Sequence, residues 1–462
     1  MKRKRTYQAE RVEQIDIEVL FPLVAAGCIV ALDVAKQKFV VALATFAGEV
    51  IKLFRFNHPT ETRRFMSVVE ALRSRVEPGK LKAAMEPTGT YGDAVRHQLV
   101  RAGVPVVMVS PKRTHDSQEL FDNVRSLHDP KSAVLIAKLC AMGLSTEWKP
   151  PPTTRVRLRA LVDLRRHEYG REEACFGRLE AVLARHWPEY GQWMDVRKQK
   201  TALLLLAQTP SAAGVAAAPD ETKAFVRRTS RGRLGPALVE GLIADSTGTM
   251  GVDMVPEEEQ LVRTLAVEAL AARQRGEELE DEMRKLTTDD DVFERLSRWM
   301  GVHTAAVIIT SCDPRQYANA RQLEKACGLN LREKSSGEHR GRLSITKRGP
   351  GAARQMLYMF ALRMIESSSV VRAWYMRRRG YTEESKQRAV VAVMRKLVRA
   401  LFHVAKGAEF DPCKLFDVRR LDIDVATIKD KGGREQRLTP RTTKRAAVRT
   451  RRAKAASTHA ST

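Results

Sequence analysis

An apolar run that ends on a single carboxylate limits the fold of this chain more than any other feature. Residues 29–32 are aliphatic and largely β-branched, as in a buried strand, and Asp33 follows them directly. Two more such runs cover residues 39–45 and 50–56, separated by an Ala-Gly turn. The pattern predicts three antiparallel strands with Asp33 at the edge of a hydrophobic layer.

Burial makes the charge of Asp33 costly, so we expect the carboxylate to have a partner. The run itself allows two interpretations. Asp33 either caps the turn or pairs with Lys36 or Lys38, or it belongs to a group of acids that share a ligand. A second strand of the same kind favours the group of acids.

That second strand covers residues 81–85 and is followed by Glu86, a Pro-Thr-Gly turn and a helical pattern over residues 91–102. A turn of this composition places Glu86 at the carboxyl end of the sheet, where α/β folds bind their ligands. Asp129 comes just before a third apolar pattern, a helix that starts near Lys131. Three acids at element ends are suited to hold a divalent metal through oxygen. Alternatively, Asp129 is simply the N-cap of its helix, in front of Pro130.

The remaining patterns up to residue 149 alternate between helix and strand. A helix with apolar residues at Phe65, Val68, Val69 and Leu72 precedes the Glu86 strand, and residues 104–109 read as another strand. Periodicity alone therefore predicts a mixed α/β domain over residues 26–149. Residues 1–25 begin with Lys-Arg-Lys-Arg and are expected to be a basic arm, either near phosphates or inert.

A Pro-Pro-Pro segment at residue 150 predicts a domain boundary. Residues 150–289 then contain two long helical patterns, at residues 155–185 and 256–286, which predict a helical hairpin or coiled coil. The hairpin either mediates self-association or packs only within the chain. Between the helices, residues 205–255 have little period and are expected to be an insertion with a basic surface strip from Lys223 to Arg233.

Composition points to a polyanionic partner. The 462 residues include 81 Lys and Arg against 55 Asp and Glu, a net charge of +26, which is unusual for an enzyme of small molecules. No apolar run is long enough for a membrane span or a signal peptide, so we expect no membrane partner. The six scattered cysteines lack a CxxC pair and are typical of reduced thiols in a cytoplasmic protein.

The region at residues 290–415 carries a second set of motifs. Gly301 separates two helical patterns, and such a turn offers backbone N–H groups to a phosphate or merely connects the helices. His303 is a possible phosphate contact of the same turn, or simply an exposed side chain. Further on, a Ser-Ser-Gly turn stands among cations and has the features of a nucleophile for phosphates, or of a plain surface loop. Its serines are Ser335 and Ser336, and its cations are Lys334, Arg340, Arg342, Lys347 and Arg348. Residues 416–462 form a basic tail that we expect to be disordered and attracted to nucleic acid.

These motifs resemble one family of insertion-sequence transposases, the family of the Piv-type DNA invertases and the bridge-RNA-guided recombinases. The first set consists of Asp33-Val-Ala-Lys, Glu86-Pro-Thr-Gly-Thr-Tyr and His128-Asp129-Pro-Lys-Ser-Ala. The second set is the Ser336-Gly turn, Ser344-Ile-Thr-Lys-Arg-Gly, Ala353-Arg-Gln-Met-Leu-Tyr-Met, Met394-Arg-Lys-Leu and Phe410-Asp-Pro. The resemblance covers residues 28–145 and 290–412, in the order of the family's two domains.

The resemblance implies an RNase H-like (RuvC-like) α/β domain, a helical or coiled-coil middle and a mainly α C-terminal domain with a helix-hairpin-helix-like segment. In the family, four acids bind a divalent metal such as Mg²⁺, and Asp33, Glu86 and Asp129 match the first three. Ser132 stands where the fourth acid is expected and brings no charge. The family's nucleophile corresponds to Ser336, with Ser335 as second choice. Met300 replaces the usual Pro before the hairpin glycine.

The implied function is DNA transposition or site-specific recombination, with serine attack on DNA phosphates and strand exchange. The family's composite sites imply a homo-oligomer, a dimer or tetramer, and some relatives use a guide RNA, which the sequence leaves open here. Two other functions remain open as well. One is a metal-dependent RuvC-like nuclease without a covalent intermediate. The other is a nucleic-acid-binding relative inactivated by Ser132.

Overall fold

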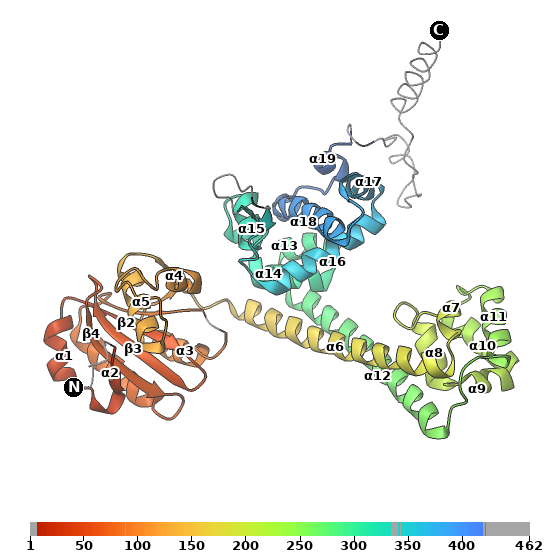
Figure 1. Cartoon of the computed structure of the whole chain (residues 1–462), viewed down its shortest axis with the longest axis horizontal. Helices are drawn as coiled ribbons and strands as arrows, with labels where there is room; N and C mark the ends of the chain where they lie inside the picture. The colour runs from red at the N-terminus through yellow and green to blue at the C-terminus, as the bar shows by residue number, and fades with distance from the viewer. Residues whose placement is uncertain (1–6, 88, 334–340, 342, 419–420, 422–462) are drawn as a thin grey trace, which may run out of the picture. The chain divides into compact units, whose positions relative to one another are not determined.

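The computed structural model describes residues 7–87, 89–333, 341, 343–418 and 421. The chain divides into two compact units, Met1–Pro151 and Pro152–Thr462. In Figure 1 the first unit runs from red to orange, and the second runs from yellow to blue. No helix in the described ranges is both long enough and apolar enough to pass through a membrane.

The first unit is built on one mixed sheet, whose strand order in the described residues is β1-β4-β3-β2-β5-β6-β7. Strand β3 pairs antiparallel with both β2 and β4, as the sequence predicts, while β2, β5 and β6 are parallel neighbours. The strands are β1 (Glu10–Arg11), β2 (Cys28–Val34), β3 (Lys38–Thr45), β4 (Val50–Asn57), β5 (Leu81–Met85), β6 (Val106–Val109) and β7 (Ser145–Glu147).

Helices cover both faces of this sheet, which explains why its central strands are continuous apolar runs rather than alternating ones. On one face, Val30 and Leu32 of β2 pack into a core with α2 (Thr62–Arg75) and α3 (Asp93–Arg101). On the other face, Ile29 and Ala31 pack against α5 (Asp129–Ala141). Figure 1 shows these helices around the sheet, with α4 (Pro111–Asp116) close to α5.

The first unit begins with short elements in the stretch that we expected to be a basic arm. Residues 10–24 contain β1, a 3-10 turn η1 (Val12–Gln14) and α1 (Ile17–Val24). Strand β1 pairs parallel with β4, and Val12, Leu20 and Val24 are buried in the core shared with α2.

The second unit contains a long antiparallel pair of helices, α6 (Thr153–His186) and α12 (Pro256–Leu286), which lie side by side in Figure 1. Ion pairs join them, among them Arg273 to Glu172 at 2.7 Å, Arg275 to Glu168 at 2.9 Å and Arg165 to Glu280 at 3.2 Å. The two helices therefore pack on each other within the chain, which was one of the two interpretations of the pattern.

Five further helices pack on one end of the hairpin and share a hydrophobic core with it. They occupy most of the segment in which the sequence showed little period, because its many alanines and glycines blur the contrast between buried and exposed positions. They are α7 (Tyr190–Trp193), α8 (Lys200–Gln208), α9 (Ala212–Ala217), α10 (Pro219–Ser230) and α11 (Pro236–Thr247). We call residues 190–247 the distal cap.

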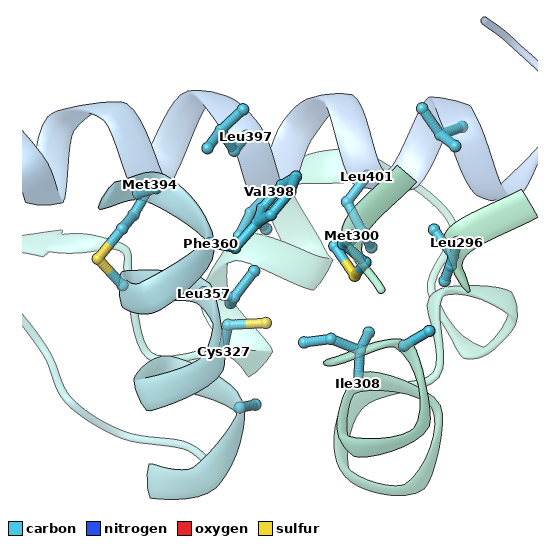
Figure 2. Packing of buried hydrophobic residues seen from close by; sticks show 14 of the residues in the cluster. Leu296, Met300, Ile308, Cys327, Leu357, Phe360, Met394, Leu397, Val398 and Leu401 are labelled. Atoms are coloured by element: carbon cyan, nitrogen blue, oxygen red, sulfur yellow. The ribbon is translucent and has the colours of Figure 1, made fainter. Parts of the chain in front are cut away.

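The rest of the second unit forms another helical core, which also takes in Leu158 of α6 and Met283 of α12. Figure 2 shows Leu296, Met300, Ile308, Leu357, Phe360, Leu397 and Leu401 meeting inside it. Its larger helices are α13 (Asp291–Met300), α14 (Val302–Cys312), α16 (Gly351–Ser367), α17 (Ser369–Arg378) and α18 (Glu383–Ala405). Its smaller elements are η2 (Pro314–Gln316), α15 (Ala320–Ala326), β8 (Leu331–Arg332), β9 (Ser344–Ile345) and α19 (Pro412–Phe416).

Candidate functional site

Two of the three acids lie next to each other because their strands are parallel neighbours. Asp33 is the next-to-last residue of β2, and Glu86 directly follows β5. Leu32 is opposite Met85 in the strand register, so Asp33 and Glu86 come level at the carboxyl ends of the two strands. Both residues are partly exposed.

The third acid comes from a helix terminus. Asp129 is the first residue of α5 and is exposed. Its helix is capped by His128, whose Nδ1 accepts the Lys131 backbone N–H at 3.4 Å. The alternative that Asp129 serves as the N-cap is therefore wrong, and its carboxylate remains available to the site.

Electrostatic interactions show that the three carboxyls converge. The pKa of Asp33 is raised to about 7, first by burial and then by the negative charges of Asp129 and Glu86, against one backbone hydrogen bond from Val34. Burial also raises the pKa of Glu86. In the described part of the chain, Asp33 forms no ion pair with Lys36 or Lys38, the other partners that the sequence suggested.

Hard carboxylate oxygens whose charges repel one another suit a hard divalent cation, which would offset the repulsion. The arrangement is nevertheless not a closed cage. Across the described residues, no three side chains of His, Cys, Asp or Glu are grouped tightly enough to hold a metal ion. The chemistry of the three acids fits a divalent metal, although the described side chains do not form a ready-made metal site.

Two hydroxyl side chains lie near the acids. Ser132 is 8% exposed and occupies α5 one turn after Asp129, where it adds no charge to the group. Thr114, on α4, is 2% exposed and faces Glu86, whose pKa its hydroxyl lowers while burial raises it more. The Thr114 hydroxyl has no hydrogen bond of standard geometry to any described residue. The sequence analysis did not identify Thr114, because a threonine in a short helix gives no signal.

A buried ion pair supports the segment that carries Asp129, and the sequence analysis missed it as well. Lys131 is 1% exposed, and its Nζ donates to Asp122 Oδ1 at 2.9 Å and to the Val124 carbonyl at 2.7 Å. The Tyr7 hydroxyl donates to Asp122 Oδ2 at 2.9 Å, and the Tyr7 ring contacts His128. Lys131 holds the pKa of Asp122 at about 2. The sequence did contain one signal of this ion pair, because Lys131 stands among the apolar residues of its helix.

In the second unit, Gly301 separates α13 from α14 as the sequence predicts. Its φ of 88° lies in the region that favours glycine, and its N–H donates to the Ser297 carbonyl. His303 faces Arg165 and Arg166 of α6, and burial together with these two cations lowers its pKa to about 4. A neutral, largely buried His303 is unsuited to bind a phosphate.

The Ser-Ser-Gly turn lies outside the described residues. Ser335, Ser336, Lys334, Arg340 and Arg342 lie outside them. The chain on both sides of the turn is described and is held together. Strands β8 and β9 pair antiparallel, and the Thr346 hydroxyl donates to Asn330 Oδ1 at 2.6 Å.

Lys347 and Arg348 follow β9 after one residue, Thr346. The Lys347 N–H donates to the Gly328 carbonyl at 2.9 Å. The lining of an open cavity of about 440 Å³ includes Tyr317, Lys325 and Arg348. The two described cations thus follow the strand by which the chain leaves the turn.

Comparison with known families finds two matches along the chain. Residues 30–188 match a model described as transposase, of the IS110 DEDD type, and residues 298–376 match a model described as the transposase IS116/IS110/IS902 family. No curated protein matches the chain. The first match contains the three acids and the second contains the Ser-Ser-Gly turn, whereas the distal cap lies outside both.

Proposed function

The chain belongs to the insertion-sequence transposase family of IS116, IS110 and IS902, with an N-terminal RuvC-like domain, and from that premise we propose that Ser336 is its nucleophile and that Asp33, Glu86 and Asp129 are its metal ligands. The family acts on DNA and cleaves and recombines it, and its N-terminal domain has the RNase H-like α/β fold. The alignment of Asp33 and Glu86 at the carboxyl ends of the parallel strands β2 and β5, with Asp129 of α5 close enough for its charge to act on Asp33, is the observation that carries the proposal.

RuvC-like nucleases of the DEDD type use divalent metals, and we propose Mg²⁺ for this chain. Asp33, Glu86 and Asp129 would hold it through carboxylate oxygens. A bound divalent cation supplies charge stabilisation to the phosphoryl group during transfer. Because each acid is anchored on a different element, the sheet and α5 together determine how closely the three carboxyls approach.

In the proposed reaction, Ser336 Oγ forms a bond to a DNA phosphorus and loses its proton. The ester bond between that phosphorus and the departing deoxyribose oxygen breaks, and the departing oxygen takes up a proton. The phosphoserine ester conserves the bond energy, so a hydroxyl of a second strand can attack the same phosphorus and release Ser336 without ATP. Ser335 is the second choice for this role.

Cations beside the turn would stabilise the charge on the phosphoryl oxygens. Lys347 and Arg348 are suited to this role because the β8–β9 pairing and the Asn330–Thr346 hydrogen bond fix the base of the turn next to them. Lys334, Arg340 and Arg342 are proposed for the same role from their sequence positions. The backbone N–H groups at the start of α14, after Gly301, are proposed to contact a DNA phosphate.

The proposal includes a homo-oligomer, a dimer or tetramer, in which the acids of one subunit act with the serine of another. The α6–α12 hairpin is a candidate for self-association, since Leu164 of α6 and Val267 of α12 are about half exposed on it. A guide RNA, as in the bridge-RNA-guided recombinases that the chain resembles, is part of the same proposal.

Covalent capture tests the proposal directly. Purified full-length protein is incubated with Mg²⁺, labelled DNA spanning the element junction, and RNA transcribed from the element's flanks. We expect a protein-DNA band that survives denaturant, and we expect Ser336→Ala and Asp33→Asn to abolish it. Two variants serve as matched controls, Ser344→Ala on β9 and Asp116→Asn on α4, and both should keep the band. Omission of the RNA tests the guide separately.

Two other outcomes would replace the proposal. Cleavage without a denaturant-stable band, unchanged in Ser336→Ala, would assign the chain as a metal-dependent nuclease. Tight binding without cleavage, with activity gained in Ser132→Asp, would identify an inactivated relative. Ser132 favours neither outcome alone, since it is buried and uncharged but lies on the same helix as Asp129.

A further inference from the structure

The distal cap is a folded module with a core of its own. Leu203 and Leu206 of α8, Val226 of α10 and Leu242 of α11 are essentially inaccessible to solvent, and they pack with Leu179 of α6. A core of this kind holds the surface helices of the cap in place. The cap therefore presents a fixed surface, and this surface lies outside both family matches.

One helix of the cap carries a row of cations on its exposed side. Thr222, Val226 and Ser230 of α10 are spaced by four residues and are buried against the core. The adjacent row, one residue further along, is Lys223, Arg227 and Arg231, and all three are exposed. Arg228 and Arg233 add two more exposed cations beside this row.

The cations of this row have few acidic partners. Lys223 lies 3.5 Å from Asp220 in a single exposed ion pair. For the described residues, no ion pair involves Arg227, Arg231 or Arg233. Some other exposed cations of the same unit are paired, for example Arg166 with Asp163 at 2.5 Å and Arg284 with Asp281 at 2.6 Å. Arg227, Arg231 and Arg233 thus bring three uncompensated charges close together on the cap.

Helix chemistry alone explains part of this row. Arginines in the last turn of α10 interact favourably with the helix dipole, typically by about 0.3–1 kcal/mol each. That role does not require Arg231 and Arg233, which lie beyond the last helical residue, Ser230. The interaction with the helix dipole also does not require the cations to lie in one exposed row.

The spacing and the place of the row fit the backbone of a duplex. Lys223 and Arg227 are four residues apart on α10, which gives a rise of about 6 Å, and Arg231 and Arg233 follow in the turn after the helix, so these cations can reach neighbouring phosphates. Helix α6 is about 50 Å long, at 1.5 Å for each of its 34 residues, which equals about 15 bp of duplex. The cap core and the core around α13 and α14 include opposite ends of the hairpin. Duplex DNA is stiff enough to span that length.

We propose that the distal cap is a second DNA-binding surface, in which Arg227, Arg231 and Arg233 bind backbone phosphates of duplex DNA that extends away from the site of strand exchange. This inference rests on the proposed function and adds to it a contact remote from the reacting phosphate. The contact is independent of base sequence, because it involves phosphates only.

The test compares two full-length triple variants with the same loss of charge. Arg227→Gln/Arg231→Gln/Arg233→Gln removes the proposed contacts. The control, Arg166→Gln/Lys198→Gln/Arg284→Gln, removes three exposed cations that are each paired with an acid three residues away. Affinity is measured over a range of salt concentrations, on duplexes of about 60 bp and about 15 bp that contain the element junction.

We expect the salt dependence of binding to the longer duplex, the slope of log K against log salt, to fall by roughly 2–3 in the cap variant, because each lost phosphate contact contributes about 0.9. The control variant should keep the wild-type slope. The shorter duplex should bind wild type and cap variant equally. A third variant with lysines at the three cap positions keeps the charge and should restore the slope.

Equal slopes for the cap variant and the control would overturn the inference. The inference would also be overturned if the cap variant lost affinity only for the element's RNA and not for the duplex. In that case RNA would be the partner of the cap. A lowered melting temperature in the cap variant, together with failure of the lysine variant to restore the slope, would assign the arginines to helix stability instead. Failure of the proposed function can be told apart from failure of this inference. If the proposed function is wrong, wild-type protein forms no covalent band on the shorter duplex.

Discussion

Asp33 is the residue at which the stability of the first unit and its proposed chemistry conflict. Its pKa is raised to about 7, so the folded state binds a proton more tightly than the unfolded chain does. A raised carboxyl pKa stabilises the fold at low pH, and this contribution is lost as the pH rises through about 7. Without metal, the ionised acids therefore destabilise the fold.

This conflict gives the first prediction. In EDTA, Asp33→Asn should be more stable than wild type by about 2–4 kcal/mol at pH 8 and by clearly less at pH 5, since each unit of pKa shift is worth about 1.4 kcal/mol. Denaturant unfolding at both pH values measures the difference. Asp116→Asn is the control: Lys112 lowers the Asp116 pKa, so its effect should not change between pH 5 and pH 8. An Asp33→Asn effect that is equal at both pH values would contradict the assignment of the raised pKa.

The second prediction concerns metal. Mg²⁺ should raise the melting temperature of wild type at pH 8, because a ligand that binds only the folded state stabilises it by mass action. The rise should be smaller in Asp33→Asn and larger in Ser132→Asp, which adds a fourth carboxylate. Thermal melts with and without Mg²⁺ measure both shifts, and an equal shift in all three proteins would rule out binding at these acids.

The third prediction concerns the buried Lys131–Asp122 pair. Lys131→Met should destabilise the first unit, because it removes the buried ammonium group that donates to Asp122 and to the Val124 carbonyl. The double variant with Asp122→Asn should recover part of the loss. Lys112→Met, at an exposed position on α4, provides the comparison. Urea titrations of wild type and the three variants measure the free energies of unfolding. If Lys131→Met and Lys112→Met lost the same stability, Lys131 would act only as an ordinary surface lysine.

At the scale of elements, the sequence predicted those with strong and long periodicity. The strands before Asp33 and Glu86, the helix with Phe65 and Leu72, and the paired helices α6 and α12 are all present. A continuous apolar run is typical of a buried strand, and a repeated apolar face is typical of a helix. These elements therefore follow from the sequence pattern alone.

The elements that the sequence did not predict are short or compositionally weak. Strands β1 and β7 have two and three residues, and their pairing with β4 and β6 depends on tertiary contacts. The helices of the distal cap are rich in alanine and glycine, which blurs their faces. The three acids stand out in the sequence because each lies at one end of a strongly patterned element, whereas Asp122 and Tyr7 belong to weakly patterned segments and are brought to Lys131 only by the fold.

The fourth prediction concerns the two helices that meet at Gly301. Gly301→Ala should destabilise the second unit by about 1–2 kcal/mol, because an alanine is strained at a φ of 88°. Gly177→Ala, at an open position within α6, should instead stabilise it by about 0.5–1 kcal/mol. Denaturant unfolding measures whether each substitution raises or lowers the free energy of unfolding. A stabilising Gly301→Ala would mean that the turn adopts another conformation in solution.

At the scale of the whole molecule, the groups proposed for the reaction belong to two compact units, the acids to one and the residues of the Ser-Ser-Gly turn to the other. The two family matches divide in nearly the same way, apart from α6, which the first match includes. Each unit has its own hydrophobic core. A reaction that needs both groups therefore requires two separately folded bodies to come together on DNA, which is why the covalent-capture test uses the full chain.

The contact of Tyr7 with Asp122 has a practical consequence for anyone who produces this protein. Tyr7 lies near the start of the chain, yet its hydroxyl completes the hydrogen bonding of the carboxylate that holds Lys131. Trimming the first nine residues, as is often done to improve expression or crystallisation, would remove that hydroxyl and loosen the segment leading to Asp129. An affinity tag is therefore better cloned at the other terminus, with the native start left intact.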